Sequence, residues 1–561
     1  MGFFILTITI AFLPSNTSLW MNPPEIVDLP PLDDGPREGH PKMEYVLYQL
    51  MKTYVNQGSE KARKFAELRG IDMEGDLVRV VAEARPFRRN MPLKKSDVMD
   101  IVTEEDFETS VNILSIQIEA LGGRVETTYR QLVQNKLPIE SLSHLAKTQH
   151  TKFIRLPIKP KPHIISEGVA KTKADDWHSF LHYRSDGAKV CVLDLGFEGF
   201  ENLLGSELPS SVNTHSFRSD GDISANEVHG TACAEIVYDM APNAELWLVN
   251  FETSVEMLTA IDWIISQGIE IISNSTGSFW GPCNGTGDAC DTVKKAANNG
   301  IIWVVSAGNE AEDHWAGIFH DPDKDGWHNF SGSDEILYFD LPAYTLVDTL
   351  LKWNDWGTWN GTSFSGSNQD YDLHLYWKVG SNWIYVDKSS NWQTGLQSPV
   401  EIIYGWYSDI PARWGIAIKK ISAFNNVKFD LFVSSHKGPI EYNIPSGSLT
   451  SPADSPCAIT VGATDWADDS YHSYSSQGPT ADGRIKPDMS APSGVSTISY
   501  GDPFYGTSAA CPHVAGAFAL LKSMTPQTLD QIKATLEALA IDLGPLGEDN
   551  KFGIGRLNLV K

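Results

Sequence analysis

The stretch AKVCVLD at residues 188–194 is an apolar run that ends in a carboxylate, and the chain after it repeats the order of strand and helix. A helical segment, HGTACAEIVYDM (229–240), is followed by the apolar run AELWLVNF (244–251). Further helical segments separate the apolar runs IEIISNS (269–275) and IIWVVSAG (301–308). Continuous apolar strands that alternate with helices are typical of a parallel sheet covered on both faces. We therefore predict an α/β fold.

This alternation stops after Asn309 and resumes with CAITVGAT (457–464). Between residues 316 and 446 the chain consists of short runs such as EILYFDL, YDLHLYW and WGIAIKKI, separated by turn residues and without a helical period. Such runs predict an all-β sandwich inserted into the α/β fold. Ten of the 17 tryptophans lie between Trp315 and Trp414, which supports a separate module. The tryptophans of WNDWGTW (353–359) are interpreted as sandwich core, with a sugar-binding platform as the alternative.

The part before the α/β pattern has a different organisation. Short predicted elements follow one another from Met43 in the order strand, helix, strand, strand, helix, strand, after a first helix near residues 44–68. This order indicates a small α+β region. The sequence therefore predicts these parts: a signal segment 1–20, a Pro-rich linker 21–42, an α+β region 43–160, the α/β parts 165–315 and 447–561, and the insertion 316–446.

Residues 3–13 (FFILTITIAFL) have the length of a signal-peptide core and are too short to span a bilayer. Since no later run reaches the roughly 18 apolar residues of a spanning helix, we expect a secreted or cell-surface protein that is not held in a membrane after export. The first basic residue is Arg37, so a signal anchor or a misassigned start codon is the alternative.

The chain is acidic and large. Its 561 residues carry 44 basic and 71 acidic side chains, a formal charge of −27. A chain of this length is expected to form several domains. The negative charge repels phosphate backbones, so nucleic acid is not an expected partner.

Six cysteines occur, and none of them forms a C-x-x-C motif, which excludes a zinc ribbon or a thioredoxin motif. Cys283 and Cys290 flank a Gly-rich loop, GPCNGTGDAC (281–290). A bridge between them would close a short loop, so we predict a disulfide there. The other four lie in apolar runs and are expected to be buried.

Three polar residues stand where strands end or helices begin. Asp194 ends its strand, and His229 and Ser508 each begin a helix. A carboxylate that holds an imidazole beside a serine hydroxyl is the arrangement that acyl transfer needs. The chain order Asp, His, Ser differs from that of chymotrypsin and of α/β-hydrolases. Asn309 ends another strand, where its amide can donate to a developing oxyanion.

Four segments that contain these residues resemble the signature segments of the subtilisin-like serine proteases: VLDLGFEG (192–199), EVHGTACAEI (227–236), VVSAGNE (304–310) and YGTSAACPHVAG (505–516). The resemblance covers most of residues 165–561. It implies that Asp194 orients His229, that His229 is the general base and acid, that Ser508 is the nucleophile and that Asn309 donates to the oxyanion. It further implies six residues that bind the substrate backbone and line the specificity pocket: Ser275, Thr276, Gly277, Ser306, Ala307 and Gly308.

By the same resemblance, the region 43–160 is similar to the propeptide that chaperones and inhibits such enzymes, which implies self-maturation. No cofactor is expected for catalysis. Two residues depart from the family pattern: Ala509 follows the nucleophile where many members carry Met, and Ser493 interrupts the Ala-Pro-Gly of the segment KPDMSAPSG. The insertion looks like the jelly-roll or prepeptidase C-terminal-type sandwiches attached to secreted proteases, and the resemblance does not say how it affects access to the cleft.

An acidic motif lies near the start of the insertion. In HDPDKDGWHNF (320–330), Asp321, Asp323 and Asp325 have the carboxylate spacing of a calcium loop. An EF-hand is excluded, since the twelfth position of the loop is Gly332 rather than Glu. We expect a structural calcium site that is closed by Asp334 or Asp372, with a solvated acidic turn as the alternative.

Together these features predict a secreted, self-maturing serine endopeptidase that acts on polypeptides. One alternative is a catalytically weak binding protein that uses the β-sandwich to hold glycans or peptides. Another is a non-peptidase serine hydrolase such as an esterase, which would be expected to carry G-x-S-x-G, whereas Ser508 lies in G-T-S-A-A.

Overall fold

The computed structural model describes residues 39–560 except 70, 87–103, 159–160, 163–167, 179–184, 186, 435–437 and 524–526. The predicted signal segment (1–20) and most of the predicted linker (21–42) lie outside the described residues. Among the helices that are described, none combines the length and the apolar character needed to cross a bilayer.

Seven parallel strands form a central sheet in the order β22-β21-β12-β10-β7-β9-β8, which confirms the predicted α/β fold. Strands from both sides of the all-β part of the sequence are neighbours in this sheet, since Trp303 of β12 pairs with Ala458 of β21. The strands are β7 Lys189–Asp194, β8 Asn213–Ser216, β9 Glu245–Asn250, β10 Ile271–Asn274, β12 Ile302–Ser306, β21 Ala458–Asp465 and β22 Met489–Ser493.

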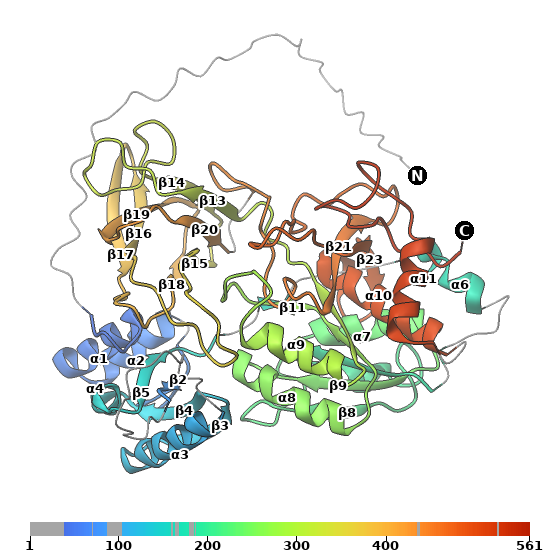
Figure 1. The fold of residues 1–561 in the computed structure, drawn as a ribbon, viewed down its shortest axis with the longest axis horizontal. Helices are drawn as coiled ribbons and strands as arrows, with labels where there is room; N and C mark the ends of the chain where they lie inside the picture. Colours follow the sequence, from blue (N-terminus) through green and yellow to red (C-terminus); the bar gives the residue numbers. More distant parts are fainter. Residues whose placement is uncertain are drawn as a thin grey trace, which may run out of the picture. The chain divides into compact units, whose positions relative to one another are not determined.

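Helices cover both faces of this sheet (Figure 1). Val190 and Val192 of β7 share one apolar cluster with α7, α10 and α11, whereas Cys191 and Leu193 share another cluster with α8 and α9. Because both faces are buried, the central strands read as nearly continuous apolar runs. The helices are α7 His229–Met240, α8 Ser254–Ser266, α9 Asp288–Asn298, α10 Thr507–Lys522 and α11 Leu529–Leu539.

Glycines allow close contacts around α7. A Cβ atom at Gly516 of α10 would lie 2.3 Å from Cβ of Met240, so the two helices approach each other where Gly516 has no side chain. A Cβ atom at Gly230 would lie 2.5 Å from the carbonyl oxygen of Gly196, which follows β7. The first contact packs the end of α7 against the middle of α10, and the second fixes the beginning of α7 against the end of β7.

Residues 39–158, called the N-terminal region below, form an antiparallel sheet with helices. The predicted first helix is two helices, because Gly58 between them has a left-handed φ of 86°. The remaining elements follow the predicted order. They are α1 Tyr45–Gln57, α2 Ser59–Leu68, β1 Met73–Glu74, β2 Leu77–Ala84, α3 Glu104–Ala120, β3 Arg124–Tyr129, β4 Leu132–Pro138, α4 Leu142–Lys147 and β5 Thr151–Arg155.

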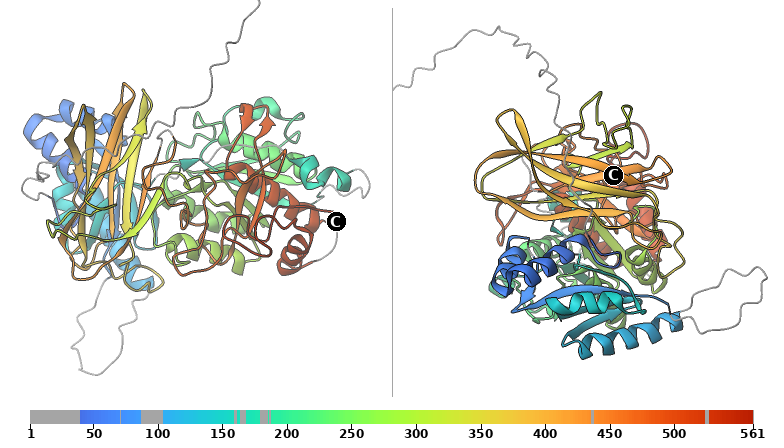
Figure 2. Two further views of the ribbon diagram at one scale, coloured as in Figure 1. Left: turned by 90° about the horizontal axis from the view of Figure 1, so that it is seen from above. Right: turned by 90° about the vertical axis from the view of Figure 1, so that its left-hand side faces the viewer.

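Residues 314–433, called the all-β segment below, hold two four-stranded antiparallel sheets. Trp353 and Tyr371, one from each sheet, share one apolar cluster, so the sheets pack against each other as two layers. Their strands, coloured yellow-green to orange, lie together in both views of Figure 2. In the order of neighbouring strands, one sheet consists of β13 His314–Ile318, β20 Lys428–Val433, β15 Thr345–Trp353 and β18 Val400–Ser408. The other consists of β14 Leu337–Leu341, β19 Ala412–Ser422, β16 Asp370–Val379 and β17 Asn382–Ser389.

Trp353 and Trp356 are buried, as expected for sandwich core, and Trp359 is half-buried. The division of the chain into the predicted domains, with their boundaries, stays a prediction.

The N-terminal region contacts the rest of the chain through arginines. Buried Arg79 of β2 forms ion pairs with Glu252 and Glu256, which lie before and within the first turn of α8. Its Nη2 lies 2.6 Å from Oε1 of Glu256. Arg69, after α2, pairs with Asp387 of the all-β segment. Buried charges need such partners, because an unpaired ion is costly to desolvate.

The end of the N-terminal region leads into the central part of the chain. The backbone N–H of Ser254 donates to the carbonyl oxygen of Ile158 at 2.9 Å. Strand β6, Lys161–Pro162, then pairs antiparallel with β11, Thr276–Gly277. The short helix α5, Val169–Thr172, follows.

Candidate active site

Asp194 and His229 meet at the edge of the central sheet. Asp194 is the last residue of β7, and His229 is the first residue of α7. Nδ1 of His229 lies 2.7 Å from Oδ1 of Asp194, which also accepts from the N–H of Leu195 at 2.8 Å. Both side chains are buried. A carboxylate on Nδ1 holds the imidazole with Nε2 directed elsewhere, which is what a general base on a hydroxyl requires.

Ser508 lies in the first turn of α10, after Gly506, whose φ is 141°. Its Oγ donates to the carbonyl oxygen of Ser275 at 3.1 Å, and its own carbonyl oxygen accepts from Oγ of Ser275 at 2.7 Å. Sγ of Cys233, one turn after His229 on α7, lies 3.7 Å from the same Ser508 carbonyl oxygen. The beginnings of α7 and α10 therefore adjoin at this edge.

Asn309 follows β12, and its side chain is oriented by the residue before Ser508. Oδ1 of Asn309 accepts from the backbone N–H and from Oγ1 of Thr507, at 2.9 and 3.0 Å. With Oδ1 held in this way, the Nδ2 amide group is the part of the side chain that can donate to an oxyanion.

The six predicted substrate-binding residues lie on two neighbouring strand ends. Ser275 and the two residues of β11 come directly after β10. Ser306 is the last residue of β12, and Ala307 and Gly308 come directly after it. Gly308 has a φ of 111°, and its N–H donates to Oγ1 of Thr507 at 3.1 Å. β11 already carries a partner strand, β6 of the same chain, in the manner of an extended peptide added to a sheet edge.

The predicted disulfide between Cys283 and Cys290 is wrong, because both thiols are free in the structure. Cys283 has a left-handed φ of 51° and points to Lys352 of β15, with Nζ 3.1 Å from Sγ. Cys290 lies on α9, where its Sγ is 3.4 Å from Oδ2 of Asp454. Each thiol therefore faces a charged group on a different part of the chain. Burial raises the pKa of Cys283 to about 11.

The three predicted metal ligands are close together. Ligand oxygens of Asp321, Asp323 and Asp325 lie within 4.8 Å of one another. Neither predicted closing residue joins them: Asp334 accepts from the hydroxyl of Tyr442 at 2.8 Å, and Asp372 lies 4.0 Å from Lys388.

Glu335 is a further acidic group near these three aspartates. Burial, followed by the charges of Asp325 and Asp323, raises the pKa of Glu335 to about 7. The donor set consists of hard carboxylate oxygens, which suits calcium.

Three residues at these sites were missed from the sequence. Thr507 orients Asn309, and its place before the serine is the only signal that could have pointed to it. Glu227 accepts from the N–H of His229 at 3.0 Å, two residues away. Glu335 lies ten residues after Asp325, outside any loop spacing that the motif suggests.

A family model described as the subtilase family matches residues 185–332 and 415–555. The minor extracellular protease Vpr of Bacillus subtilis is 23% identical over 524 residues, which cover 78% of this chain and 61% of that protein. Subtilisin E of the same species is 26% identical over 286 residues, 44% of this chain and 71% of that protein. The chain thus spans about three-fifths of the length of Vpr.

Solved structures give weaker likenesses. The CspB protease of Clostridium perfringens matches with a TM-score of 0.49 and 15% identity, covering 70% of this chain and 97% of that one. The epidermin leader peptide processing protease EpiP of Staphylococcus aureus matches with a TM-score of 0.45 and 13% identity, covering 86% and 98%.

The state of the cysteines is directly testable. We expect all six thiols to react with Ellman's reagent in denaturant and only Cys457, which is half-exposed, to react promptly in the native chain. Burial keeps the others in the protonated form, raising the pKa of Cys511 to about 12. Cys457→Ser should remove the prompt reaction. If only four thiols reacted in denaturant, a disulfide bond would be present and the structure would be contradicted.

Proposed function

Because the chain belongs to the subtilase family, we propose that it is a serine endopeptidase in which Ser508 is the nucleophile. The observation that carries this proposal is the 2.7 Å contact between His229 and Asp194 at the edge where Ser508 begins α10. The hydrogen bond between Ser508 and the Ser275 carbonyl supports it, since that strand would bind the substrate backbone beside the nucleophile.

In the proposed reaction, Nε2 of His229 takes the proton of Ser508 as Oγ attacks the scissile carbonyl carbon. Asp194 holds the imidazole and stabilises its protonated form. The Nδ2 group of Asn309 and the N–H of Ser508 donate to the oxyanion of the tetrahedral intermediate. His229 then protonates the leaving amine. In the second half of the reaction, His229 takes a proton from a water molecule that attacks the acyl-enzyme, and returns it to Oγ of Ser508 as the acid product leaves.

The substrate backbone would bind between the two strand ends described above. Ser275, Thr276 and Gly277 would pair with the residues before the scissile bond. Ser306, Ala307 and Gly308 would line the specificity pocket, where a Cβ atom at Gly308 would already lie 2.7 Å from Oγ of Ser476. This architecture needs no cofactor for the reaction. The substrates proposed are polypeptides.

We also propose that the N-terminal region, within the predicted boundaries 43–160, is a propeptide that inhibits the enzyme and is removed by it. The pairing of β6 with β11 supports this, because it places the chain's own backbone where a substrate backbone would pair. The acidic interface with Arg79 supports the role of a folding template. Export from the cell is part of the proposal, in keeping with the name of the extracellular relative Vpr.

The alternatives are less well supported. A binding protein that had lost its activity would have no use for a buried carboxylate held against an imidazole, which costs desolvation energy. An esterase remains without a specific observation in its favour.

Maturation tests the proposal. Lys161 pairs with Gly277 and Pro162 with Thr276, so the next position on the enzyme strand is Ser275, which contacts Ser508. Gly168 is already packed against Pro492, since a Cβ atom there would lie 2.5 Å from the Pro492 Cβ. We therefore expect the mature chain to begin between residues 163 and 168. N-terminal sequencing and intact mass of the purified protein measure this.

The Ser508→Ala variant should accumulate as the full-length chain, because it lacks the nucleophile. Ser523→Ala, at the other end of α10, is the matched control and should mature normally. Normal maturation of Ser508→Ala in a host without other proteases would contradict self-processing.

Calcium as a structural ion is a further part of the proposal, carried by the carboxylates of Asp321, Asp323 and Asp325, with Glu335 nearby. Binding to the folded chain alone at 100 times the dissociation constant would stabilise it by about 2.7 kcal/mol. We expect calcium to raise the melting temperature of the native chain and not that of Asp323→Asn. Asp409→Asn, an exposed carboxylate of the same segment, should keep the effect. An equal response of all three proteins would locate the ion elsewhere.

A further inference from the structure

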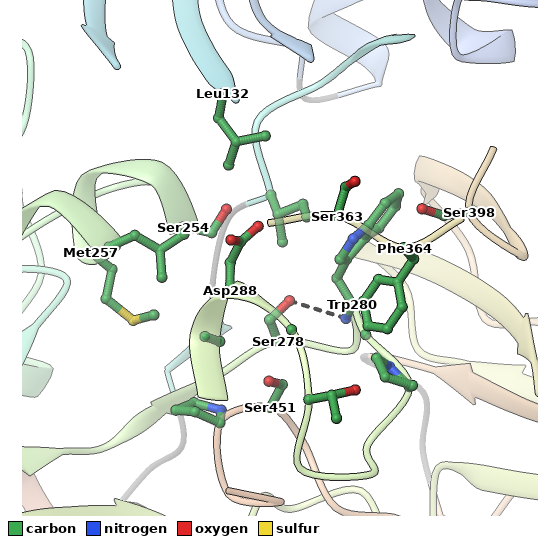
Figure 3. Close-up of a pocket in the computed structure, with 18 of the residues that line it drawn as sticks. Leu132, Ser254, Met257, Ser278, Trp280, Asp288, Ser363, Phe364, Ser398 and Ser451 are labelled. Atoms are coloured by element: carbon green, nitrogen blue, oxygen red, sulfur yellow. Dashed lines mark hydrogen bonds between the residues drawn. The ribbon is translucent and has the colours of Figure 1, made fainter. Parts of the chain in front are cut away.

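A pocket of about 110 Å³ lies where the N-terminal region, the central part of the chain and the all-β segment meet. Figure 3 shows Leu132 approaching it from the N-terminal region, Ser254 and Met257 from α8, and Phe364 from the all-β segment. Gly277, which belongs to β11 and pairs with β6, and the following Ser278 also line it. The pocket is therefore continuous with the proposed substrate-binding strand.

The chain segment that leads to β6 passes along this pocket. Arg155 and Ile158 are among its lining residues, and the Ile158 carbonyl oxygen accepts from Ser254. The guanidinium carbon of buried Arg155 lies 5.2 Å from the centre of the Trp280 ring. Nε of Arg155 also pairs with Oε1 of Glu83 in the N-terminal region at 3.0 Å, and the cation–π interaction with the Trp280 face adds to this ion pair. Trp280 belongs to the loop that follows β11, so this contact would remain available after the N-terminal region has left.

The central part of the chain contributes a carboxylate to the same pocket. Asp288, the first residue of α9, is labelled within it in Figure 3. In the unprocessed chain, Oδ1 of Asp288 lies 3.3 Å from Nη1 of Arg130, a residue of the N-terminal region. Burial raises the pKa of Asp288 to about 6, against the opposing charge of Arg130. Removal of the N-terminal region takes both arginines away and leaves the aromatic face and the carboxylate without these cations.

We propose that the part of this pocket that stays on the mature enzyme is a distal subsite that binds the side chain of an arginine or lysine upstream of the scissile bond in a polypeptide substrate. The proposal rests on the proposed function and specifies its substrates. Trp280 supplies the aromatic face, and Asp288 supplies the counter-charge. Arg155 marks the spacing: it precedes Pro162, the last residue of β6, by seven residues.

The test uses the mature enzyme and fluorogenic peptides with the sequence of residues 151–170. We expect the peptide with Arg155 to be cleaved with a kcat/KM on the order of three- to tenfold above that of the Arg155→Gln peptide, the range of a cation–π contact. An isomeric peptide in which the residues of positions 155 and 156 change places has the same charge. It should behave like the Gln peptide, because neighbouring side chains of an extended chain point to opposite sides.

Two enzyme variants locate the effect. Trp280→Leu should lose the discrimination between the Arg and Gln peptides, and Trp377→Leu, a partly exposed tryptophan of β16, should keep it. Equal cleavage of the three peptides by the unmodified enzyme would overturn the subsite while leaving the proposed function intact. The subsite would also be overturned if the isomeric peptide were cleaved as efficiently as the peptide with Arg155, because that result would indicate attraction by overall charge. A short peptide of residues 159–170 serves as a further substrate without position 155. If the mature enzyme cleaved neither this peptide nor any of the three longer ones, the proposed function itself would be overturned.

Discussion

The close packing of α7 against α10 is the constraint on which the rest of the site depends. Both helices begin at the same edge of the parallel sheet, and Gly516 lets them approach at Met240. A side chain at Gly230 would collide with the Gly196 carbonyl oxygen, so the same kind of close contact joins α7 to the end of β7. The beginning of α7 carries His229 against Asp194, and Cys233, one turn later, lies 3.7 Å from the carbonyl oxygen of Ser508 at the beginning of α10. Rigid elements would thereby fix the geometry that acyl transfer needs in our proposal.

Charge organises the contacts of the N-terminal region. The whole chain carries a formal charge of −27, yet the N-terminal region meets the rest through arginines that face carboxylates: Arg79 with Glu256, Arg130 with Asp288 and Arg69 with Asp387. These pairs are largely buried, so salt screens them less than surface pairs. The same acidic surface that binds the propeptide in our account would face substrates after its removal.

Local sequence motifs were enough to propose the candidate catalytic residues. The pairing of side chains that are distant in the sequence could be found only from the structure. Asp194, His229, Ser508 and Asn309 could be proposed because each lies at or shortly after the end of a strand or in the first turn of a helix, and the order of strands and helices predicted the parallel sheet. The disulfide failed, because the direction of Cys283 is set by Lys352, which is distant in the sequence. The charges of Asp325 and Asp323 act on Glu335, which lies ten residues after Asp325, and the ring of Trp280 faces Arg155 of the N-terminal region. No sequence pattern records these pairings.

The central claim is that His229, held by Asp194, activates Ser508. Labelling of the mature protein with a fluorophosphonate, followed by peptide mass spectrometry, tests it most directly, because the reagent forms a stable adduct only with an activated hydroxyl. We predict one adduct per chain, on Ser508. For His229→Ala, whose N-terminal region has to be removed by an unrelated protease, we predict a labelling rate at least 100-fold lower than that of the unmodified chain processed in the same way, about the loss expected without a general base. An adduct on a different serine, or undiminished labelling of Ser508 in His229→Ala, would contradict the account.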